Sequence, residues 1–407
     1  NQTIKNLIPG FYELTVYAAY RADGFNQSYA QNSFIYAGEN KVYTAALIEG
    51  MQPADPAPAH ADKFEPVTDI EGNTIGYLPT NTSALAYAFG DGLYKHTLIA
   101  EVGEDSTLTI GISTPGCKAA NQTWVGPFSM TYCGEMENEL AVAAMDRMLE
   151  CQAARLTTLS EKYPAFSTDN GNPNAAPNYS VATQAKVAET IGTISAATSA
   201  QEKMAKIKEL GDLMQEVYDT KMAYTSMMTK AEVLQEISGE MFLAEMITEE
   251  EAAKMDESYN TITNAYLDGA YSLEEALNVN PFAGLSFMPV IENNVAQLGN
   301  AKELIMFSSL VNAGIGNTLD AVLTGDIDMA GVTFYAPIGY ATPSTLNNYG
   351  GEITVPGYQG VFDGRGYSIK NLTATYNSNY ASSGVFGNNS GTIRNLIIDN
   401  YVFEFGD

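Results

Sequence analysis

Residues 360–400 decide the fold of the C-terminal part of this chain, because they contain a repeat. Their sequence is GVFDGRGYSIKNLTATYNSNYASSGVFGNNSGTIRNLIIDN. The motif Gly-Val-Phe begins at Gly360 and again at Gly384, 24 positions later. The pair Asn-Leu begins at Asn371 and again at Asn395, also 24 positions later. A fixed period of this length is typical of solenoids, in which each repeat buries its apolar face only against its neighbours.

The residues inside each repeat predict strands. They are mostly β-branched or aromatic, and glycine and Asp-Gly turns bound them. The expected fold is the start of a parallel β-helix, in which equivalent residues of adjacent coils stack one strand spacing of about 4.8 Å apart. We therefore expect Phe362 to stack on Phe386, and Asn371 on Asn395. The repeat residues are Gly360, Phe362, Asp363, Gly364, Asn371, Gly384, Phe386 and Asn395.

An insertion interrupts the repeat upstream. Ile327 and Ile369 are equivalent in the motif, but the sequence between them is much longer than one coil of 24 positions. Residues 341–357 have about the length of this excess, so we expect them to form a loop that leaves the solenoid. Residues 301–310 show the pattern of an amphipathic helix, which would cover the open edge of the first coil.

Five segments of this region resemble the GLUG-type β-helix repeats of bacterial surface proteins. They are residues 323–329, 337–339, 362–364, 369–372 and 384–387. Such repeats also occur outside the catalytic domain of immunoglobulin A metallopeptidases. The resemblance covers about the last quarter of the chain. It implies that residues 281–407 are a capping helix followed by a truncated GLUG-type β-helix.

Length and composition narrow the class of protein. A chain of 407 residues predicts two or three domains. The net charge of −28 argues against nucleic acid and against anionic lipid surfaces as partners, and no apolar run is long enough to insert in a membrane. Three cysteines are too few for a disulfide framework. A bridge between Cys117 and Cys133 is one alternative, and two unpaired buried thiols are the favoured one.

Residues 1–134 predict an all-β domain. Strands are expected near residues 11–19, 32–36, 42–47, 96–102, 107–113 and 128–133, separated by Gly, Asp and Asn as in a sandwich. Several segments resemble the galactose-binding-like jelly-roll domains of Bacteroidota surface proteins. They are residues 7–12, 79–84, 89–94, 108–112 and 124–128. Related folds serve as carbohydrate-binding modules, so the resemblance implies a jelly-roll sandwich that could bind a glycan.

Residues 135–280 change character and predict an all-α helical bundle. Apolar residues recur three and four positions apart in three stripes. The stripes are Met145, Leu149, Gln152, Leu156 and Leu159; Ile207, Leu210, Met214 and Val217; and Met255, Tyr259, Ile262 and Tyr266. Thr248 with Glu251, and Ser272 with Glu275, predict capping boxes at two helix starts. Residues 266–272 resemble the FIVAR-type helical modules that space sugar-binding domains, which implies a spacer.

No motif in the sequence predicts catalysis, a metal or a cofactor. His60 and His96 are the only histidines and are not in a His-Glu-x-x-His pattern. Asp326 and Asp328 would share one face of a strand, as the paired carboxylates of β-helix polysaccharide-degrading enzymes do. The repeat itself accounts for both residues, so a structural role is favoured over a catalytic one. Asp363 lies in an Asp-Gly turn and is expected to be structural.

One loop of the predicted sandwich is a candidate glycan site. It follows the strand at residues 11–19 and gathers aromatic and polar side chains, which are Tyr20, Arg21, Asp23, Phe25 and Tyr29. Sugar rings stack on aromatic faces, and neighbouring polar groups can fix their hydroxyls. An ordinary tyrosine-containing loop is the competing interpretation.

The sequence as a whole therefore predicts a multidomain protein. Its parts would be an all-β jelly-roll sandwich (1–134), an all-α helical bundle (135–280) and the start of a parallel β-helix (281–407). The expected function is a non-catalytic adhesin or glycan-binding protein, secreted or on a bacterial cell surface, with glycans or host surface molecules as partners. The alternatives are an accessory region of a larger secreted peptidase or polysaccharide-degrading enzyme, and a structural stalk. The chain is expected to be a fragment, with any export signal or anchor outside it.

Overall fold

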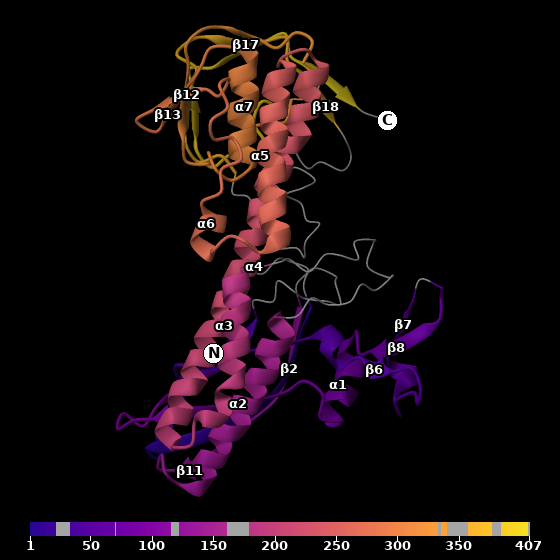
Figure 1. Ribbon diagram of the computed structural model, residues 1–407, viewed down its shortest axis with the longest axis vertical. Helices are drawn as coiled ribbons and strands as arrows, with labels where there is room; N and C mark the ends of the chain where they lie inside the picture. Colours follow the sequence, from indigo (N-terminus) through magenta and orange to yellow (C-terminus); the bar gives the residue numbers. More distant parts are fainter. Residues whose placement is uncertain are drawn as a thin grey trace. The chain divides into compact units, whose positions relative to one another are not determined.

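The computed structural model describes residues 1–21, 33–69, 71–114, 122–160, 179–332, 335–339, 357–376 and 384–405. They combine α-helices with several β-sheets, as predicted for a multidomain chain (Figure 1). They divide into two compact units, unit 1 (Asn1–Met222) and unit 2 (from Ala223 onward). The division falls within the long helix α4 (Ala200–Leu243). It differs from the predicted divisions after residues 134 and 280.

Two sheets form the first part of unit 1. The first has the order β1 (Gln2–Ile4), β10 (Leu108–Ser113), β3 (Phe34–Ala37) and β4 (Asn40–Tyr43), with every pair antiparallel. The second is built around β2 (Gly10–Arg21), which pairs antiparallel with β11 (Gln122–Gly134) and β9 (Lys95–Val102) and parallel with β5 (Ala45–Ala46). The long predicted strands are confirmed, and the alternating burial of β2 places its apolar residues in the core that both sheets share.

A small subdomain in unit 1 was not predicted. Its sheet has the order β6 (Gln52–Pro53), β8 (Thr74–Leu78) and β7 (Glu65–Thr68), next to the short 3₁₀ helices η1 (Leu47–Gly50) and η2 (Ala61–Lys63). Helix α1 (Thr82–Gly90) begins at Asn81, whose side chain accepts a hydrogen bond from the Ala84 amide at 3.0 Å. Asn81 was therefore an available start signal for this helix.

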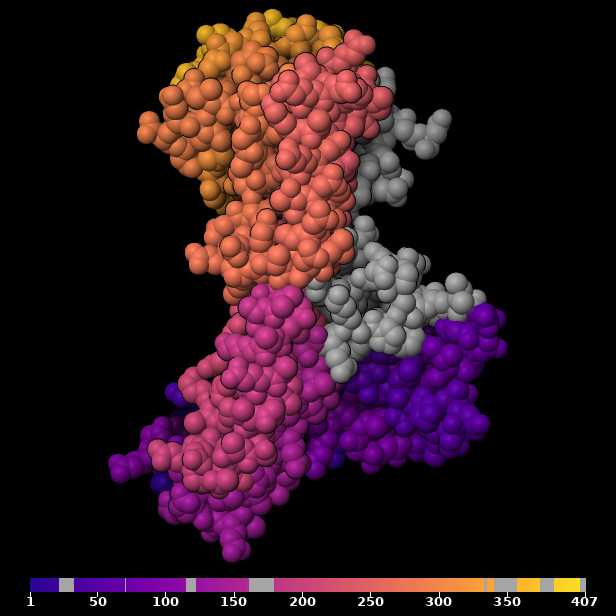
Figure 2. Space-filling model, viewed as in Figure 1, coloured from indigo at the N-terminus to yellow at the C-terminus, as the bar shows by residue number. Residues whose placement is uncertain are grey.

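Helices α2 (Glu139–Ser160), α3 (Val181–Gly192) and the first part of α4 complete unit 1, with η3 (Ile194–Ala196) between them. The two predicted apolar stripes of α2 and α4 are confirmed, because every residue in them is buried. These helices share one hydrophobic core with the sheets. Arg147 of α2 also forms a bidentate pair with Glu13 of β2, at 2.6 and 2.7 Å. This shared core is why no compact unit ends at residue 134, and Figure 2 shows the helical surface running directly into that of the strands.

Unit 2 begins with helices. The end of α4 packs with α5 (Glu249–Asp268) and α6 (Leu273–Leu277) around buried Tyr224, Met227 and Ile262. Both predicted capping boxes are confirmed, with Thr248 and Ser272 as the N-caps of α5 and α6. Helix α7 (Ala301–Asn312) confirms the predicted helix, but it is not amphipathic. All its residues from Leu304 to Asn312 are buried, and it runs beside β13 (Val295–Leu298) as a core element (Figure 1).

Short parallel strands form the rest of unit 2. One sheet has the order β12 (Val290–Glu292), β13 (Val295–Leu298), β14 (Asp320–Leu323), β16 (Val361–Asp363) and β19 (Thr392–Arg394). A second contains β15 (Ile327–Asp328), β17 (Ser368–Lys370) and β20 (Ile397–Asp399), and a third contains β18 (Thr373–Tyr376) and β21 (Val402–Phe405). Every neighbouring pair is parallel except the β12–β13 hairpin. Strands β16, β17 and β18 thus pair in turn with β19, β20 and β21. We call each such set of three successive strands a circuit.

The strand register corrects the predicted period. Phe362 lies opposite Ile393, and Ile369 lies opposite Ile398, so one circuit is longer than the predicted period of 24 positions. Phe386 pairs with Ile338, and its ring meets the Phe362 ring edge-on at a centroid distance of 5.1 Å. The two Gly-Val-Phe motifs thus lie within one circuit, with their phenylalanines in contact, and do not occupy equivalent positions in adjacent circuits.

The predicted stacking of Asn371 on Asn395 is also wrong. Asn371 accepts a hydrogen bond from the Asn400 amide at 2.6 Å and donates one to Asp328 at 2.8 Å. Asn395 instead donates to Asp363 at 3.0 Å. The three asparagines have φ between 50° and 56°, the left-handed conformation that asparagine tolerates at a corner. The Asn-Leu pair therefore marks two different corners of a circuit.

One predicted register is confirmed. Ile327 lies opposite Ile369 in the parallel pair of β15 and β17, despite the long insertion between them. The expected inserted loop lies outside the described residues over positions 341–356. Gly360 explains why glycine begins the repeat, since a Cβ there would lie 2.1 Å from the carbonyl oxygen of Leu319 on the neighbouring segment. Close approach of the two backbones requires glycine at this position.

Candidate functional site

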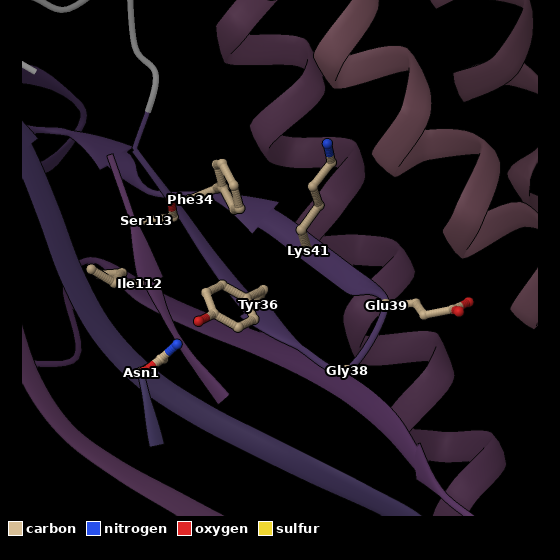
Figure 3. A pocket seen from close by; sticks show the side chains of 8 residues that line it. All are labelled: Asn1, Phe34, Tyr36, Gly38, Glu39, Lys41, Ile112 and Ser113. Atoms are coloured by element: carbon tan, nitrogen blue, oxygen red, sulfur yellow. The ribbon is translucent and has the colours of Figure 1, made fainter. Parts of the chain in front are cut away.

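The strongest candidate site in unit 1 is a hollow of about 510 Å³ over the outer face of the sheet β1-β10-β3-β4 (Figure 3). Its lining residues are Asn1, Phe34, Tyr36, Gly38, Glu39, Lys41, Ile112 and Ser113. The volume falls within the range of about 300–1,000 Å³ in which small-molecule sites commonly lie. We call this site the hollow.

Side-chain size on neighbouring strands produces the hollow. The aromatic residues Phe34 and Tyr36 of β3 project from the outer face, because Ile35 between them is fully buried on the other side. In register with them, β10 presents only Ser113 and Gly111. Large side chains on one strand and small ones on the next leave a depression between them.

Gly111 allows the Tyr36 ring to lie across β10. A Cβ at this glycine would be 2.7 Å from the Tyr36 hydroxyl oxygen and 2.9 Å from Cζ, closer than any real Cβ contact. The φ angle of Gly111 is not in the left-handed region, so the backbone does not demand glycine here. The requirement comes from the ring, which Figure 3 shows with its hydroxyl directed toward Asn1.

Helix α4 supports the hollow from the β4 side. The Phe34 ring contacts the rings of Tyr36 and Tyr43 at centroid distances of 6.3 and 6.0 Å, and Tyr43 stacks on Tyr218 of α4 at 6.1 Å. The Tyr43 hydroxyl donates to Gln215 Oε1 of α4 at 2.9 Å. Burial, with the nearby charge of Asp219, raises the pKa of Tyr43, so its hydroxyl stays protonated as a donor.

Lys41 provides a positive charge at the hollow. Its ammonium donates one hydrogen bond, to Gln215 Oε1 at 3.0 Å, and lies 5.5 Å from the centre of the Phe34 ring. Acidic residues outnumber basic ones by 48 to 20 in this chain. Even so, no carboxylate of the described residues forms an ion pair with Lys41. The hollow thus combines two aromatic rings, a hydroxyl pair from Tyr36 and Ser113, and an ammonium group, which suits a ligand with an apolar ring face and polar substituents.

The loop predicted as a glycan site is only partly described. Asp23, Phe25 and Tyr29 lie outside the described residues. Tyr20 is fully buried and pairs with Thr123 across the sheet, so its ring is not available to stack on a sugar, and this part of the prediction is wrong. Strand β2 continues past the predicted end at residue 19, and Tyr20 is still directed into the core.

Arg21 is half-buried at the end of β2. Its guanidinium donates to Gln122 Oε1 at 2.9 Å and lies 5.7 Å from the centre of the Trp124 ring. These contacts join β2 to β11 at the point where their pairing begins. They account for Arg21 as a structural residue, although its Nε has no hydrogen-bond partner among the described residues.

The two aspartates weighed as a catalytic pair are engaged in structural contacts. Asp326 accepts hydrogen bonds from the backbone and hydroxyl of Ser368 and pairs with Lys370 at 2.7 Å. These contacts lower the pKa of Asp326 to about 2. Hydrogen bonds from the Asn371 side chain and the Ala330 amide lower the pKa of Asp328. Both groups are therefore ionised at neutral pH and hold neighbouring segments together.

The histidines and cysteines form no reactive cluster in the part of the chain that is described. His96 is buried between backbone groups, with Nδ1 donating to the Tyr94 carbonyl at 2.8 Å and Nε2 accepting from the Ala45 amide at 2.9 Å. Burial lowers the pKa of His96 to about 4, so the ring is neutral and structural. Cys133 and Cys151 are free thiols, and Cys117 lies outside the described residues.

Sequence reasoning missed the residues of the hollow, although a signal was present. Phe34 and Tyr36 are two positions apart in a predicted strand, which places both rings on one face. Gly38 and Glu39 form the turn that brings Lys41 opposite Tyr36 in the register of β3 and β4. The small residues of β10 give no such signal, because only the strand pairing shows that Gly111 faces an aromatic ring.

Comparisons of the chain with protein-family models, with curated proteins and with solved structures found no match. Within the described ranges, no group of three or more His, Cys, Asp and Glu side chains could hold a metal ion. No helix among the same residues is both long enough and apolar enough to cross a membrane.

Proposed function

We propose that this protein binds carbohydrate, without catalysis in the region described, and that the hollow is its binding site. The observation that carries the proposal is the pair of half-buried rings, Phe34 and Tyr36, beside an ammonium group that is only partly engaged by the described residues. Sugars present an apolar ring face with hydroxyls at its edge, and this arrangement matches both features. We further propose a bacterial cell surface or extracellular location, where glycans and host surface molecules are the available partners.

The proposal extends to the architecture. The two mainly antiparallel sheets around one core support a jelly-roll sandwich that carries the site. The parallel strands that repeat in the same order support the start of a parallel β-helix. In unit 2 the outward polar groups bind one another, which favours a scaffold role for that region as the second candidate function.

Binding should be weak at a single site. A stacked ring contributes about 0.5–1.5 kcal/mol and each hydrogen bond about 1 kcal/mol. Strong attachment to a surface would then require several copies acting together.

Titration calorimetry of the full chain with a panel of soluble polysaccharides tests the function. Tyr36→Ala should weaken binding about tenfold, which corresponds to about 1.4 kcal/mol. Tyr367→Ala is the matched control, because Tyr367 is an exposed tyrosine of unit 2, far from the hollow in sequence and outside its lining. It should bind as the unmodified protein does.

A second variant keeps the Tyr36 ring but changes its position. Gly111→Ala adds only a methyl group, but its Cβ would lie 2.7 Å from the Tyr36 hydroxyl oxygen, so the ring would have to move. The fold should survive, because the end of a flexible side chain can move. Binding should fall nearly as far as in Tyr36→Ala. Unchanged affinity in both variants, or no binding of any polysaccharide by the unmodified protein, would overturn the proposed function.

A further inference from the structure

The charged groups of the hollow point to the class of sugar that it selects. Building on the carbohydrate-binding function proposed above, we propose that the hollow prefers acidic sugars and that Lys41 recognises their carboxylate. Lys41 is the only basic side chain among the described residues that line the hollow. Aromatic rings and hydroxyls alone would bind neutral and acidic sugars equally well, and a basic side chain is the kind of group that would create a preference.

The Lys41 ammonium has hydrogen bonds left to give. A lysine ammonium carries three N–H donors. One donates to Gln215 Oε1, and the ammonium lies near the face of the Phe34 ring. No other hydrogen-bond acceptor of the described residues contacts it. A carboxylate at the edge of a stacked sugar would accept the remaining bonds, and such charge-assisted bonds are about twice as strong as neutral ones.

A fixed support holds the Lys41 ammonium in place. Gln215 Oε1 accepts bonds from both Lys41 and Tyr43, while Gln215 Nε2 donates to Asp219 at 2.9 Å. This chain of bonds fixes the orientation of the amide. The Asp219 carboxylate is bonded to this neutral amide and forms no ion pair with Lys41 among the described residues. A pre-positioned side chain loses less entropy on binding.

Besides Asp219, two negative features oppose an acidic ligand, and neither cancels the contact. Glu39 also lines the hollow, but its side chain is exposed and Figure 3 shows it directed away from Phe34 and Tyr36. The net charge of −28 repels an anionic polymer at a distance. At physiological salt this repulsion is screened beyond about 8 Å, whereas a direct hydrogen-bonded contact is screened much less.

Matched ligand pairs test the preference. Calorimetry of the full chain at about 0.15 M salt would compare galacturonate oligosaccharides with the same oligosaccharides after reduction of their carboxyl groups. Sialyllactose and its carboxyl-reduced derivative form a second pair. We expect the acidic member of at least one pair to bind about tenfold more tightly. Lys41→Gln should weaken binding of the acidic sugar far more than binding of the neutral sugar, and so reduce this difference, whereas Lys41→Arg should keep it. Lys95→Gln, which changes an exposed lysine of β9, is the control.

The outcomes separate this inference from the function on which it rests. Equal binding of acidic and neutral members in both pairs overturns the preference and leaves carbohydrate binding in place. Equal weakening of both members by Lys41→Gln shows that Lys41 contacts hydroxyls or positions the ring, which also overturns it. If the unmodified protein binds no sugar of the panel, the proposed function and this inference fall together.

Discussion

The outward polar groups on the parallel strands of unit 2 and those on β3 and β4 of unit 1 differ in how they are used. In unit 2, the outward groups of neighbouring strands bind one another, as Asp326 does with Lys370 and Asp363 with Arg394 at 3.0 Å. In unit 1, the outer face of β3 and β4 carries Tyr36 and Lys41, whose polar groups are largely unengaged by the described residues. A polar group that the fold already satisfies is structural, whereas one that the fold leaves available can serve a ligand.

The same contrast holds for the aromatic rings. Phe362 of unit 2 is fully buried and contacts the rings of Phe307 and Phe386 at 6.4 and 5.1 Å. Phe34 and Tyr36 of unit 1 are half-buried and line an open hollow. Aromatic content alone therefore does not locate a binding site, but the exposure of each ring does.

The largest effect should come from the buried ring cluster of unit 2. Phe362→Ala removes a fully buried ring and should destabilise unit 2 by about 3–5 kcal/mol. Hydrogen exchange should show the loss in α7 and β14, while β2 and β9 of unit 1 keep their protection. Tyr367→Ala, which truncates an exposed ring, should cost less than about 0.5 kcal/mol. Equal loss of protection in β2 and β9 would break the distinction between the two units.

The second prediction is that the stability of unit 1 depends on pH through His96, whereas the stability of unit 2 does not. The pKa of His96, buried in unit 1, is about 4 when folded and about 6.5 when unfolded. Between these two pH values, the His96 side chain therefore binds a proton in the unfolded chain but not in the folded one. Stability from this group is present above about pH 6.5 and falls as the pH drops toward 4, by about 3 kcal/mol in all. Unit 2 contains no histidine, so it should not share this loss.

Denaturant unfolding at several pH values, followed by hydrogen exchange of β9, measures this effect. His96→Gln is the informative variant, because an amide can donate to the Tyr94 carbonyl and accept from the Ala45 amide without titrating. It should flatten the pH dependence of unit 1 between pH 6.5 and 4. An unchanged pH dependence in this variant would show that His96 is not the cause.

Local patterns made the helices predictable. The stripe that includes Met145 and Leu149 needs only the helical period, and the Thr248–Glu251 capping box needs only four adjacent residues. The stripe depends only on one buried face of a helix, and the capping box depends only on contacts within one short segment. The boundary between the two compact units could not be predicted in the same way. A change in composition at residue 135 does not show that the helices and strands share one core.

Long-range register limited the other predictions. The repeat correctly indicated strands and placed Ile327 opposite Ile369. It failed for Phe386, because a motif can recur at a second position of the same circuit as well as at the same position of the next. Gly111 shows the same limit in the candidate site, since its importance depends on which residue of β3 lies beside it. Sequence spacing cannot supply that information without the pairing.

The smallest predicted effect concerns the exposed Asp326–Lys370 pair of unit 2. Hydrogen bonds from Lys370 and Ser368 hold the folded pKa of Asp326 at about 2, below its unfolded value near 3.9. The stability from this depressed pKa is present above about pH 4 and is lost as the pH falls toward 2. Solvent screens an exposed pair, so the loss should be smaller than the one expected from His96.

Asp326→Asn tests this last effect. The amide can still accept from Ser368 but cannot carry the charge, so the thermal stability of unit 2 should drop slightly at pH 7 and depend less on pH between 4 and 2. Asp399→Asn is the matched control, because this nearby aspartate is in register with Lys370 and no hydrogen bond of its side chain is among the described contacts. If Asp326→Asn and Asp399→Asn behave alike, the outward contacts of unit 2 are general surface charge, and the contrast with the hollow of unit 1 loses its support.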